Sequence, residues 1–359
     1  MERLQLVNTS CEDAISGRKL KLFYTFLTFK TEMIISRTPF RISFFGGGTD
    51  YPPWYREHGG AVLSTTFDKY CYITCRELPP FFDHKYRIAY SKIENTKSMD
   101  DIEHPAIRGV LQEMNLPSGL EIHADADLPA RSGLGSSSSF VVGMLNALKA
   151  LKGERVTKEW LAYEAIRIEQ DVLKENVGSQ DQTAAAFGGL NVIQFHKDGS
   201  LAIDPLILPN QRKENLNNHL MLFFTGFSRI ASEIAESKIA NLSKKSDELH
   251  AIRSMVDDAI DILSSNQDIR SLGELLHQGW EYKRKLSEKV STTAIDDLYL
   301  RARNAGAIGG KLLGAGGGGF MLICVEPQNR SQVRAALSDL VEVPFKFEST
   351  GSQVIYYQP

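Results

Sequence analysis

The densest group of residues that could perform chemistry is the stretch Leu128–Lys152, LPARSGLGSSSSFVVGMLNALKALK. Apolar residues in its second half recur at a spacing near 3.6, which predicts an amphipathic helix beginning near Ser136 or Ser137. The start of a helix offers unpaired N–H groups and the positive end of the macrodipole, so it attracts phosphate. Gly133 and Gly135 would let the backbone curl around that anion. For this segment alone, a flexible connector followed by a serine-capped helix is the alternative.

Two further stretches place carboxylates beside glycines. Ile34–Asp50 is an apolar strand pattern ending in GGGTD, and polyglycine at a strand end indicates close approach of the backbone to a ligand or another segment. Asp50 is placed to accept hydrogen bonds from hydroxyl groups. Asn176–Phe195 sets Asp181 in a short turn or at a helix start. An N-cap role is the alternative for Asp181.

A third glycine-rich stretch lies in Ala307–Glu326 and formally contains G-x-G-x-x-G at Gly314, Gly316 and Gly319. A dinucleotide-binding fingerprint precedes a helix, whereas FMLICV follows here and predicts a strand. A hairpin or loop that packs bare backbone against a neighbour or ligand fits better. The chain has no Walker A loop and no protein-kinase motif set, so ATP binding would depend on the serine-rich turn.

Composition narrows the class of protein. The net charge of -3 gives no basic footprint for nucleic acid, and no apolar run approaches the roughly 18 residues of a membrane span. The apolar run Leu22–Phe29 lacks the cleavage site of a signal peptide. The scattered cysteines Cys11, Cys71, Cys75 and Cys324 predict structural thiols rather than disulfides or a zinc site. We therefore expect a cytoplasmic protein with small-molecule substrates, no nucleic-acid partner and no membrane partner; a homo-oligomer stays open.

Residues 1–32 match no motif and are expected to form a poorly ordered extension. Strand patterns follow, and those at Gly59–Leu78 and Tyr86–Ser91 predict an antiparallel sheet. Further strands are expected at Leu120–Pro129, Met221–Arg229 and Ser352–Gln358, with helices at His104–Met114 and Lys158–Lys174. Helical patterns dominate from the strand at 221–229 to about residue 305, which predicts that this strand opens a second domain.

Three ordered segments carry a family resemblance: Thr38–Tyr51, Leu128–Phe140 and Lys311–Leu322. They resemble the three motifs of the GHMP small-molecule kinases, such as galactokinase, homoserine kinase, mevalonate kinase and phosphomevalonate kinase. The resemblance implies an α+β fold of two domains with ATP and substrate between them. Residues 33–205 would form an ATP-binding domain like domain 2 of ribosomal protein S5, and residues 206–359 a ferredoxin-like α/β plait.

Within that superfamily, RTPFRISFFGGGTD, GGAVLSTTFDKY and GSQDQTAAAFGG are most similar to the D-glycero-D-manno-heptose 7-phosphate kinases. This resemblance implies ATP-dependent phosphorylation of the anomeric hydroxyl to give a heptose 1,7-bisphosphate, for GDP-heptose used in capsule or lipopolysaccharide. A fucokinase-like or other sugar 1-kinase is the nearest alternative. An ATP-dependent decarboxylase and a non-catalytic sugar sensor on the same scaffold also stay open.

The resemblance also implies residue roles, with ATP as co-substrate and Mg²⁺ as cofactor. Asp181 would be the general base, Arg41 would stabilise the transferring phosphoryl group, and Ser137 with Glu169 would bind Mg²⁺. The nucleotide would be bound by Pro129, Arg131, Ser132, Gly133, Leu134, Gly135, Ser136, Ser137 and Ser138. The sugar would be bound by Gly46, Gly47, Gly48, Thr49, Asp50, Gly316, Gly317 and Gly318.

Each of these roles has a structural alternative. Glu169 would otherwise be a surface residue of an amphipathic helix, and Arg41 would otherwise pair with a buried carboxylate such as Asp181. Galactokinases have Glu-His where this chain has Gly47 and Gly48, which indicates room for a larger, phosphorylated substrate. Candidate cations for the substrate phosphate are Arg37, Lys69, Arg87, Arg108 and Arg131.

Overall fold

Long β-branched and aromatic runs build the first sheet. In the computed structural model, β1 (Met33–Phe45) pairs along its length with β2 (Gly60–Glu77), and the order of strands is β13-β1-β2-β5-β3-β4. The other strands of this path are β3 (Tyr86–Ala89), β4 (Ile93–Thr96), β5 (Leu120–Ala126) and β13 (Gln353–Gln358). Three short strands join at β2 or its neighbour: β6 (Leu190–Phe195), β7 (Leu201–Pro205) and β12 (Phe347–Glu348).

The sheet is mixed rather than antiparallel throughout, so the sequence-based expectation was wrong at one pair. Strand β3 runs parallel to β5, with Ile88 opposite Ile122. The physical reason is the connection between them, which passes through β4 and then α2 (Pro105–Met114), because a helical crossover returns the chain in the same direction.

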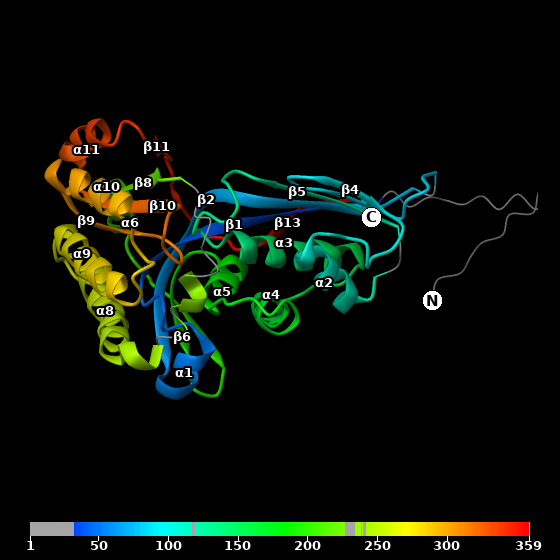
Figure 1. Cartoon of the computed structure of the whole chain (residues 1–359), viewed down its shortest axis with the longest axis horizontal. Helices are drawn as coiled ribbons and strands as arrows, with labels where there is room; N and C mark the ends of the chain where they lie inside the picture. Colours follow the sequence, from blue (N-terminus) through cyan, green and yellow to red (C-terminus); the bar gives the residue numbers. More distant parts are fainter. Residues whose placement is uncertain are drawn as a thin grey trace, which may run out of the picture. The chain divides into compact units, whose positions relative to one another are not determined.

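Helices cover one face of this sheet, as Figure 1 shows. They are α2, α3 (Ser136–Leu151), α4 (Lys158–Arg167) and α5 (Gln180–Phe187), while α1 (Pro52–His58) follows the end of β1. Helix α3 packs closely on β1: the Ser36 hydroxyl of β1 donates a hydrogen bond to the Gly143 carbonyl of α3 at 2.7 Å. The helix expected over 158–174 ends at Arg167 and continues as a π-helical turn, Ile168–Val172, a form common at functional sites.

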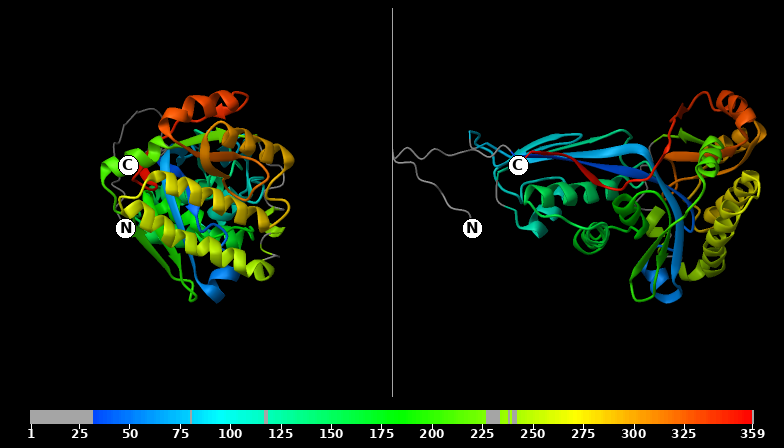
Figure 2. Two further views of the ribbon diagram at one scale, coloured as in Figure 1. Left: turned by 90° about the vertical axis from the view of Figure 1, so that its left-hand side faces the viewer. Right: turned by 180° about the vertical axis from the view of Figure 1, so that it is seen from behind.

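A second sheet has the order β11-β8-β10-β9. Its strands are β8 (Leu220–Phe224), β9 (Ala307–Leu312), β10 (Phe320–Val325) and β11 (Val341–Glu342). Around it lie α6 (Asn210–Asn218), α8 (Ser246–Ser264), α9 (Ile269–Lys285), α10 (Thr293–Asn304) and α11 (Arg330–Ala336), with 3-10 turns at Leu242–Lys245 and Pro327–Asn329 (Figures 1 and 2). The chain then returns to the first sheet through β12 and β13. The predicted domain boundary between residues 205 and 206 stays a prediction.

The structure describes residues 32–79, 81–116, 119–226, 234–237, 239 and 242–358. The predicted extension over residues 1–32 therefore lies outside the described residues, apart from Glu32, and so does the end of the strand expected at 221–229. Thr31–Pro359 forms one compact unit.

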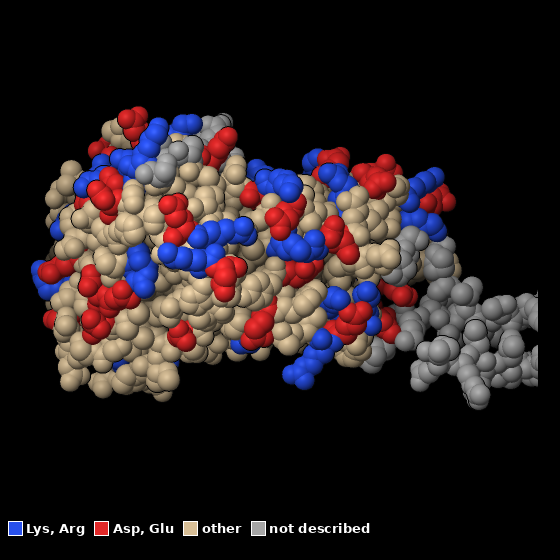
Figure 3. Space-filling model, turned by 90° about the horizontal axis from the view of Figure 1, so that it is seen from below, with Lys and Arg blue, Asp and Glu red and all other residues tan. Residues whose placement is uncertain are grey.

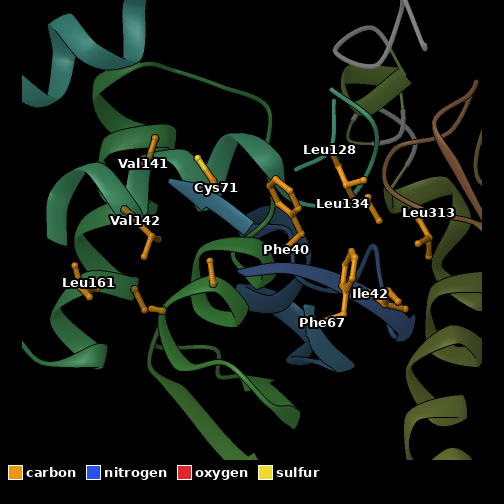
Figure 4. Close-up of a cluster of buried hydrophobic side chains, with 14 of the residues drawn as sticks. Phe40, Ile42, Phe67, Cys71, Leu128, Leu134, Val141, Val142, Leu161 and Leu313 are labelled. Atoms are coloured by element: carbon orange, nitrogen blue, oxygen red, sulfur yellow. The ribbon is translucent and has the colours of Figure 1, made fainter. Parts of the chain in front are cut away.

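A single apolar cluster joins the serine-rich turn to both sheets. It includes Phe40 and Ile42 of β1, Leu134 of the turn, Val141 of α3 and Leu313 after β9, all buried (Figure 4). Because interiors are close-packed, this cluster fixes the turn relative to the strands that carry the other site residues.

On the face drawn in Figure 3 the charged side chains are mixed in sign, and two of the thiols are buried. Lys and Arg side chains are interspersed with Asp and Glu on the face drawn in Figure 3. Cys71 and Cys75 are free and buried, and burial raises the pKa of each thiol to about 12. Among the described residues, no helix combines the length and apolar character needed to cross a bilayer.

Candidate active site

The serine-rich turn has the backbone conformation that an anion cradle requires. Gly133 and Gly135 have φ values of 84° and 75°, in the left-handed region, and α3 begins at Ser136 as predicted. Gly135 is the N-cap residue and offers no side-chain cap. The first helical hydrogen bond runs from the Ser139 amide to the Gly135 carbonyl, so the amides of the three preceding serines point out of the helix start. These amides are suited to bind phosphate oxygens.

The glycine-rich hairpin between β9 and β10 packs its backbone against the backbone of this turn. A Cβ atom on Gly314 would lie 2.4 Å from the Gly133 Cα, and one on Gly133 would lie 2.7 Å from the Leu313 carbonyl oxygen. The Phe320 amide donates to the Ser132 carbonyl at 3.1 Å. The predicted hairpin with bare backbone against a neighbour is therefore confirmed, and the neighbour is the serine-rich turn.

Other predicted residues of these two loops have mainly structural contacts. Ser132 is buried and donates its hydroxyl to the Pro129 carbonyl at 2.6 Å. A Cβ on Gly316 would lie 2.6 Å from the Val290 carbonyl oxygen, and the Gly317 amide donates to that same oxygen at 2.9 Å. The contacts of Gly316 and Gly317 are thus to the segment before α10. Their predicted contact with a sugar stays a prediction, as does that of Gly318.

Sequence reasoning missed Lys283, a buried residue of α9. Its ammonium group donates to the carbonyls of Leu312 and Gly314 at 2.6 and 2.8 Å. Lys283 therefore holds the hairpin that supports the turn. No local motif marks it, because its partners are backbone atoms about 30 residues away in the chain.

Arg41 and Asp181 form a bidentate ion pair at the mouth of the turn. Nε and Nη2 of Arg41 donate to Oδ1 and Oδ2 of Asp181, each at 2.7 Å, and Nη1 donates to the Gly133 carbonyl at 2.8 Å. A Cβ on Gly135 would lie 3.4 Å from Asp181 Oδ2, so the carboxylate borders the phosphate cradle. The arginine side chain is 5% exposed and the aspartate 25%, which leaves the carboxylate accessible to a substrate.

These contacts bear on the alternatives. Ser179, not Asp181, is the N-cap residue of α5, so the N-cap role is excluded for Asp181. The pairing of Arg41 with Asp181 is the contact that the structural alternative for Arg41 required.

Glu169 lies in the π-helical turn and is fully buried against α3. Its carboxylate accepts hydrogen bonds from the hydroxyls of Ser137 at 2.9 Å and Ser138 at 2.7 Å, and from the Gln182 side-chain amide. A surface position is thus excluded. Burial raises the pKa of Glu169 to about 7, with the nearby charge of Glu175 acting in the same direction and the hydrogen bonds opposing it. A buried carboxylate with neutral partners is suited to a cation.

The raised pKa predicts how stability depends on pH. The pKa of the carboxyl group is about 7 in the folded chain and 4.5 in the unfolded chain, so folding takes up a proton between pH 4.5 and 7. The free energy of unfolding therefore falls as pH rises through this range. Glu169→Gln removes this penalty and should raise the free energy of unfolding by about 2 kcal/mol more at pH 8 than at pH 5. Urea denaturation in EDTA measures the difference, with Glu274→Gln, at an exposed side chain, as control. Equal gains at both pH values would contradict the assignment.

Asp50 follows the glycine run and is buried. Its Oδ1 accepts from the Gly48 amide at 2.8 Å and its Oδ2 from the Gln180 side-chain amide at 2.9 Å. Burial raises the pKa of Asp50, and the charge of Asp181 adds to this effect. Asp50 and Asp181 therefore lie close enough for their charges to interact.

The glycine run and Thr49 shape this corner. The Thr49 hydroxyl donates to the carbonyls of Gly46 and Ala61 at 2.8 and 3.0 Å, so these bonds tie the loop to β2. A Cβ on Gly46 would lie 1.9 Å from the Ala61 carbonyl oxygen. A small cavity beside Gly46 and Gly47 is also lined by Lys283 and Lys311.

Most candidate cations for a substrate phosphate are engaged elsewhere. Arg37 lies 4.5 Å over the Tyr70 ring, Lys69 pairs with Asp68, Arg87 pairs with Glu121, and Arg108 donates to the Ile102 carbonyl. Arg131 is exposed in the turn, where it has a left-handed φ of 58° and donates its amide to the Ser136 hydroxyl.

The donor set at Ser137 and Glu169 fits a hard cation. One carboxylate and one hydroxyl, completed by phosphate oxygens, suit Mg²⁺. Within the described ranges, no group of three or more His, Cys, Asp or Glu side chains could hold a metal, so an ion here would need oxygens from the nucleotide.

Comparison with known proteins defines the class. The family model for the GHMP kinases N terminal domain matches residues 102–189, and the model for the GHMP kinases C terminal matches residues 250–342. The chain therefore belongs to the GHMP kinases, which use ATP, and the predicted two-domain α+β fold is confirmed.

The similar proteins include sugar-phosphate kinases. The chain is 31% identical to the D-glycero-alpha-D-manno-heptose 7-phosphate kinase of Campylobacter jejuni, over 85% of this chain and 93% of the relative. The crystal structure of a D-glycero-D-manno-heptose 1-phosphate kinase from Bacteriodes thetaiotaomicron superposes with a TM-score of 0.74 at 27% identity, over 91% of this chain and all of that one. The bifunctional fucokinase/GDP-fucose pyrophosphorylase of Arabidopsis thaliana is 24% identical over 86% of this chain, which spans 31% of that relative.

Proposed function

We propose that this kinase phosphorylates the anomeric hydroxyl of a sugar phosphate, and that its substrate is D-glycero-D-manno-heptose 7-phosphate. The product would be the 1,7-bisphosphate, a precursor of GDP-heptose for capsule or lipopolysaccharide. The observation that carries the proposal is the position of Asp181, whose carboxylate lies 3.4 Å from the Cβ position of Gly135 at the phosphate cradle. The similarity to heptose phosphate kinases supports the choice of sugar.

The proposed reaction is direct transfer. The carboxylate of Asp181 accepts the proton of the anomeric hydroxyl as that oxygen forms a bond to the γ-phosphorus of ATP. The bond from the γ-phosphorus to the β,γ-bridging oxygen breaks, so ADP leaves with the electron pair and the sugar gains the phosphoryl group. Each Asp181 oxygen accepts from Arg41 and retains a second acceptor site for the substrate hydroxyl.

The remaining residues would position the reactants. The amides at the start of α3 would bind the phosphate oxygens, and Arg41 would stabilise charge that develops on the transferring group. Ser137 and Glu169 would hold Mg²⁺, which would supply neutralisation of the phosphate charge. Asp50 would bind sugar hydroxyls, and an exposed turn residue, Arg131, is the candidate for the nucleotide phosphates.

Coupled ADP release tests this proposal against its rivals. Purified enzyme is supplied with ATP, Mg²⁺ and one of three additions: heptose 7-phosphate, L-fucose or no sugar. We expect sugar-dependent ADP release with heptose 7-phosphate, at least tenfold faster than with fucose, and no carbon dioxide. Faster turnover of fucose would favour a fucokinase. Release of carbon dioxide would favour a decarboxylase, and the absence of ADP release with both sugars would favour a sensor.

A further inference from the structure

We propose that Ser43, Gln180 and Asp50 form a pocket that binds the substrate hydroxyl adjacent to the one that Asp181 deprotonates. The inference rests on the proposed function, and it adds Ser43 and Gln180 as residues that determine which sugars are accepted. Ser43 belongs to β1 and Gln180 is the first residue of α5.

The first observation concerns Gly47, in the middle of the glycine run. Gly46 and Gly48 have φ values of 85° and 111°, which favour glycine for backbone reasons. Gly47 does not have a positive φ, and a Cβ there would be in ordinary contact with the Ser43 hydroxyl oxygen at 3.5 Å and with Gln180 Nε2 at 3.7 Å. The backbone therefore does not require glycine at this position, and the missing side chain leaves space that faces Ser43 and Gln180.

The second observation is that the Ser43 hydroxyl, which faces this space, and the oxygen of the Gln180 amide whose nitrogen borders it have no partner. Among the described residues, the buried atoms Ser43 Oγ and Gln180 Oε1 make no hydrogen bond. Ser43 is 6% exposed, so bulk water does not solvate its hydroxyl freely. Buried polar atoms are nearly always paired in native proteins, so the unpaired Ser43 hydroxyl beside this space and the unpaired oxygen of the adjoining Gln180 amide point to a ligand that pairs them.

The chemistry of these atoms defines the ligand group. Gln180 Nε2 donates to Asp50 Oδ2 at 2.9 Å, so Oε1 of the same amide points away from the Asp50 carboxylate. Oε1 can only accept, so the ligand group must donate, while the Ser43 hydroxyl can do either. A sugar hydroxyl, which donates one hydrogen bond and accepts others, satisfies both atoms.

The position of the pocket identifies which sugar hydroxyl it would bind. Gln180 directly precedes Asp181, and Ser43 lies two residues after Arg41, on the same face of β1. Arg41 on that face is hydrogen-bonded to Asp181, so the group bound here neighbours the group at the base. In a sugar 1-kinase the neighbour of the anomeric hydroxyl is the hydroxyl at C2, so we infer a substrate class with a free C2 hydroxyl.

The test compares Ser43→Ala with the wild-type enzyme on two substrates, D-glycero-D-manno-heptose 7-phosphate and its 2-deoxy analogue. We expect Ser43→Ala to lower kcat/KM for the natural sugar by about tenfold, the usual effect of one lost hydrogen bond, and to leave kcat/KM for the 2-deoxy sugar unchanged. KM for ATP should not change. Because the hydroxyl makes no bond in the free protein, Tm should not fall.

Two variants complete the experiment. Ser254→Ala removes a hydroxyl on α8 that bonds only within its own helix, and it should match the wild type on both sugars. Gly47→Ala fills the space with one methyl group that the backbone accepts, and it should raise KM for the natural sugar while Tm stays unchanged. An equal loss on both sugars, or a fall in Tm with Ser43→Ala, would overturn the pocket. Failure of the proposed function is distinct, because the wild-type enzyme would then release no ADP with heptose 7-phosphate, and the pocket assignment would fall with it.

Discussion

Replacing Asp181 with Asn is expected to lower kcat by about 10³-fold or more while the affinity for ATP stays within a few-fold. The amide of Asn cannot take a proton from the sugar hydroxyl, but its oxygen can still accept one of the two hydrogen bonds that Arg41 donates. The Gly133 carbonyl, in the turn that would bind ATP, accepts a hydrogen bond from Arg41. The substitution at Asp181 does not remove this bond, so the turn stays held by Arg41. Steady-state kinetics together with titration of a non-hydrolysable ATP analogue measures both quantities.

The matched control is another bidentate pair. Arg301 of α10 pairs with Asp339 on the surface, so Asp339→Asn removes the same charge from the same kind of contact and should keep wild-type kcat. If Asp181→Asn retained most of its activity, or lost activity only together with Tm, the Arg41–Asp181 pair would be structural and the base would have to be another group.

The second large effect is expected at Gly133. Gly133→Ala should weaken ATP binding by about 100-fold and lower Tm, because the new methyl group would lie 2.7 Å from the Leu313 carbonyl oxygen and neither backbone can move easily. The left-handed φ of 84° adds about 1 kcal/mol of strain. Calorimetric titration with ATP and thermal denaturation measure the two effects.

The control variant Gly153→Ala separates the effect of backbone strain from the effect of the collision expected at Gly133. Gly153 has a similar φ of 70°, and nothing lies within 4 Å of its Cβ position, so the substitution adds the strain without the collision. We expect a small fall in Tm and unchanged ATP affinity. Equal ATP affinity in the two variants would show that the hairpin does not support the cradle.

Local sequence patterns predicted much of the fold. The start of α3 at Ser136, the strands β1 and β2 and the hairpin between β9 and β10 follow from periodicity and glycine placement, which are properties of neighbouring residues. The break of the expected helix at Arg167 did not follow from them, because Glu169 is held in its π-helical turn by Ser137 and Ser138, more than 30 residues away. Long-range contacts of this kind override local propensity.

The sequence pointed to the residues of the candidate site but not to most of their contacts. The pairing of Arg41 with Asp181 joins residues 140 positions apart and was foreseen only as one alternative. Lys283 and Gln182 were missed, since each acts through a contact that no local pattern encodes. Ser43, part of the pocket proposed above, was missed because a serine within a strand has no distinguishing spacing. Its signal is an unpaired hydroxyl, which only the folded structure reveals.

Phosphorus NMR of the reaction product tests the central claim most directly. Enzyme, ATP and Mg²⁺ are incubated with heptose 7-phosphate, and the spectrum is followed as ADP appears. The account predicts a new phosphorus signal split by the anomeric proton, beside the unchanged 7-phosphate signal. With Asp181→Asn, the new signal and ADP should appear about 10³-fold more slowly, and the 7-phosphate signal should remain. A new phosphate on any other hydroxyl, or release of inorganic phosphate alone, would contradict it.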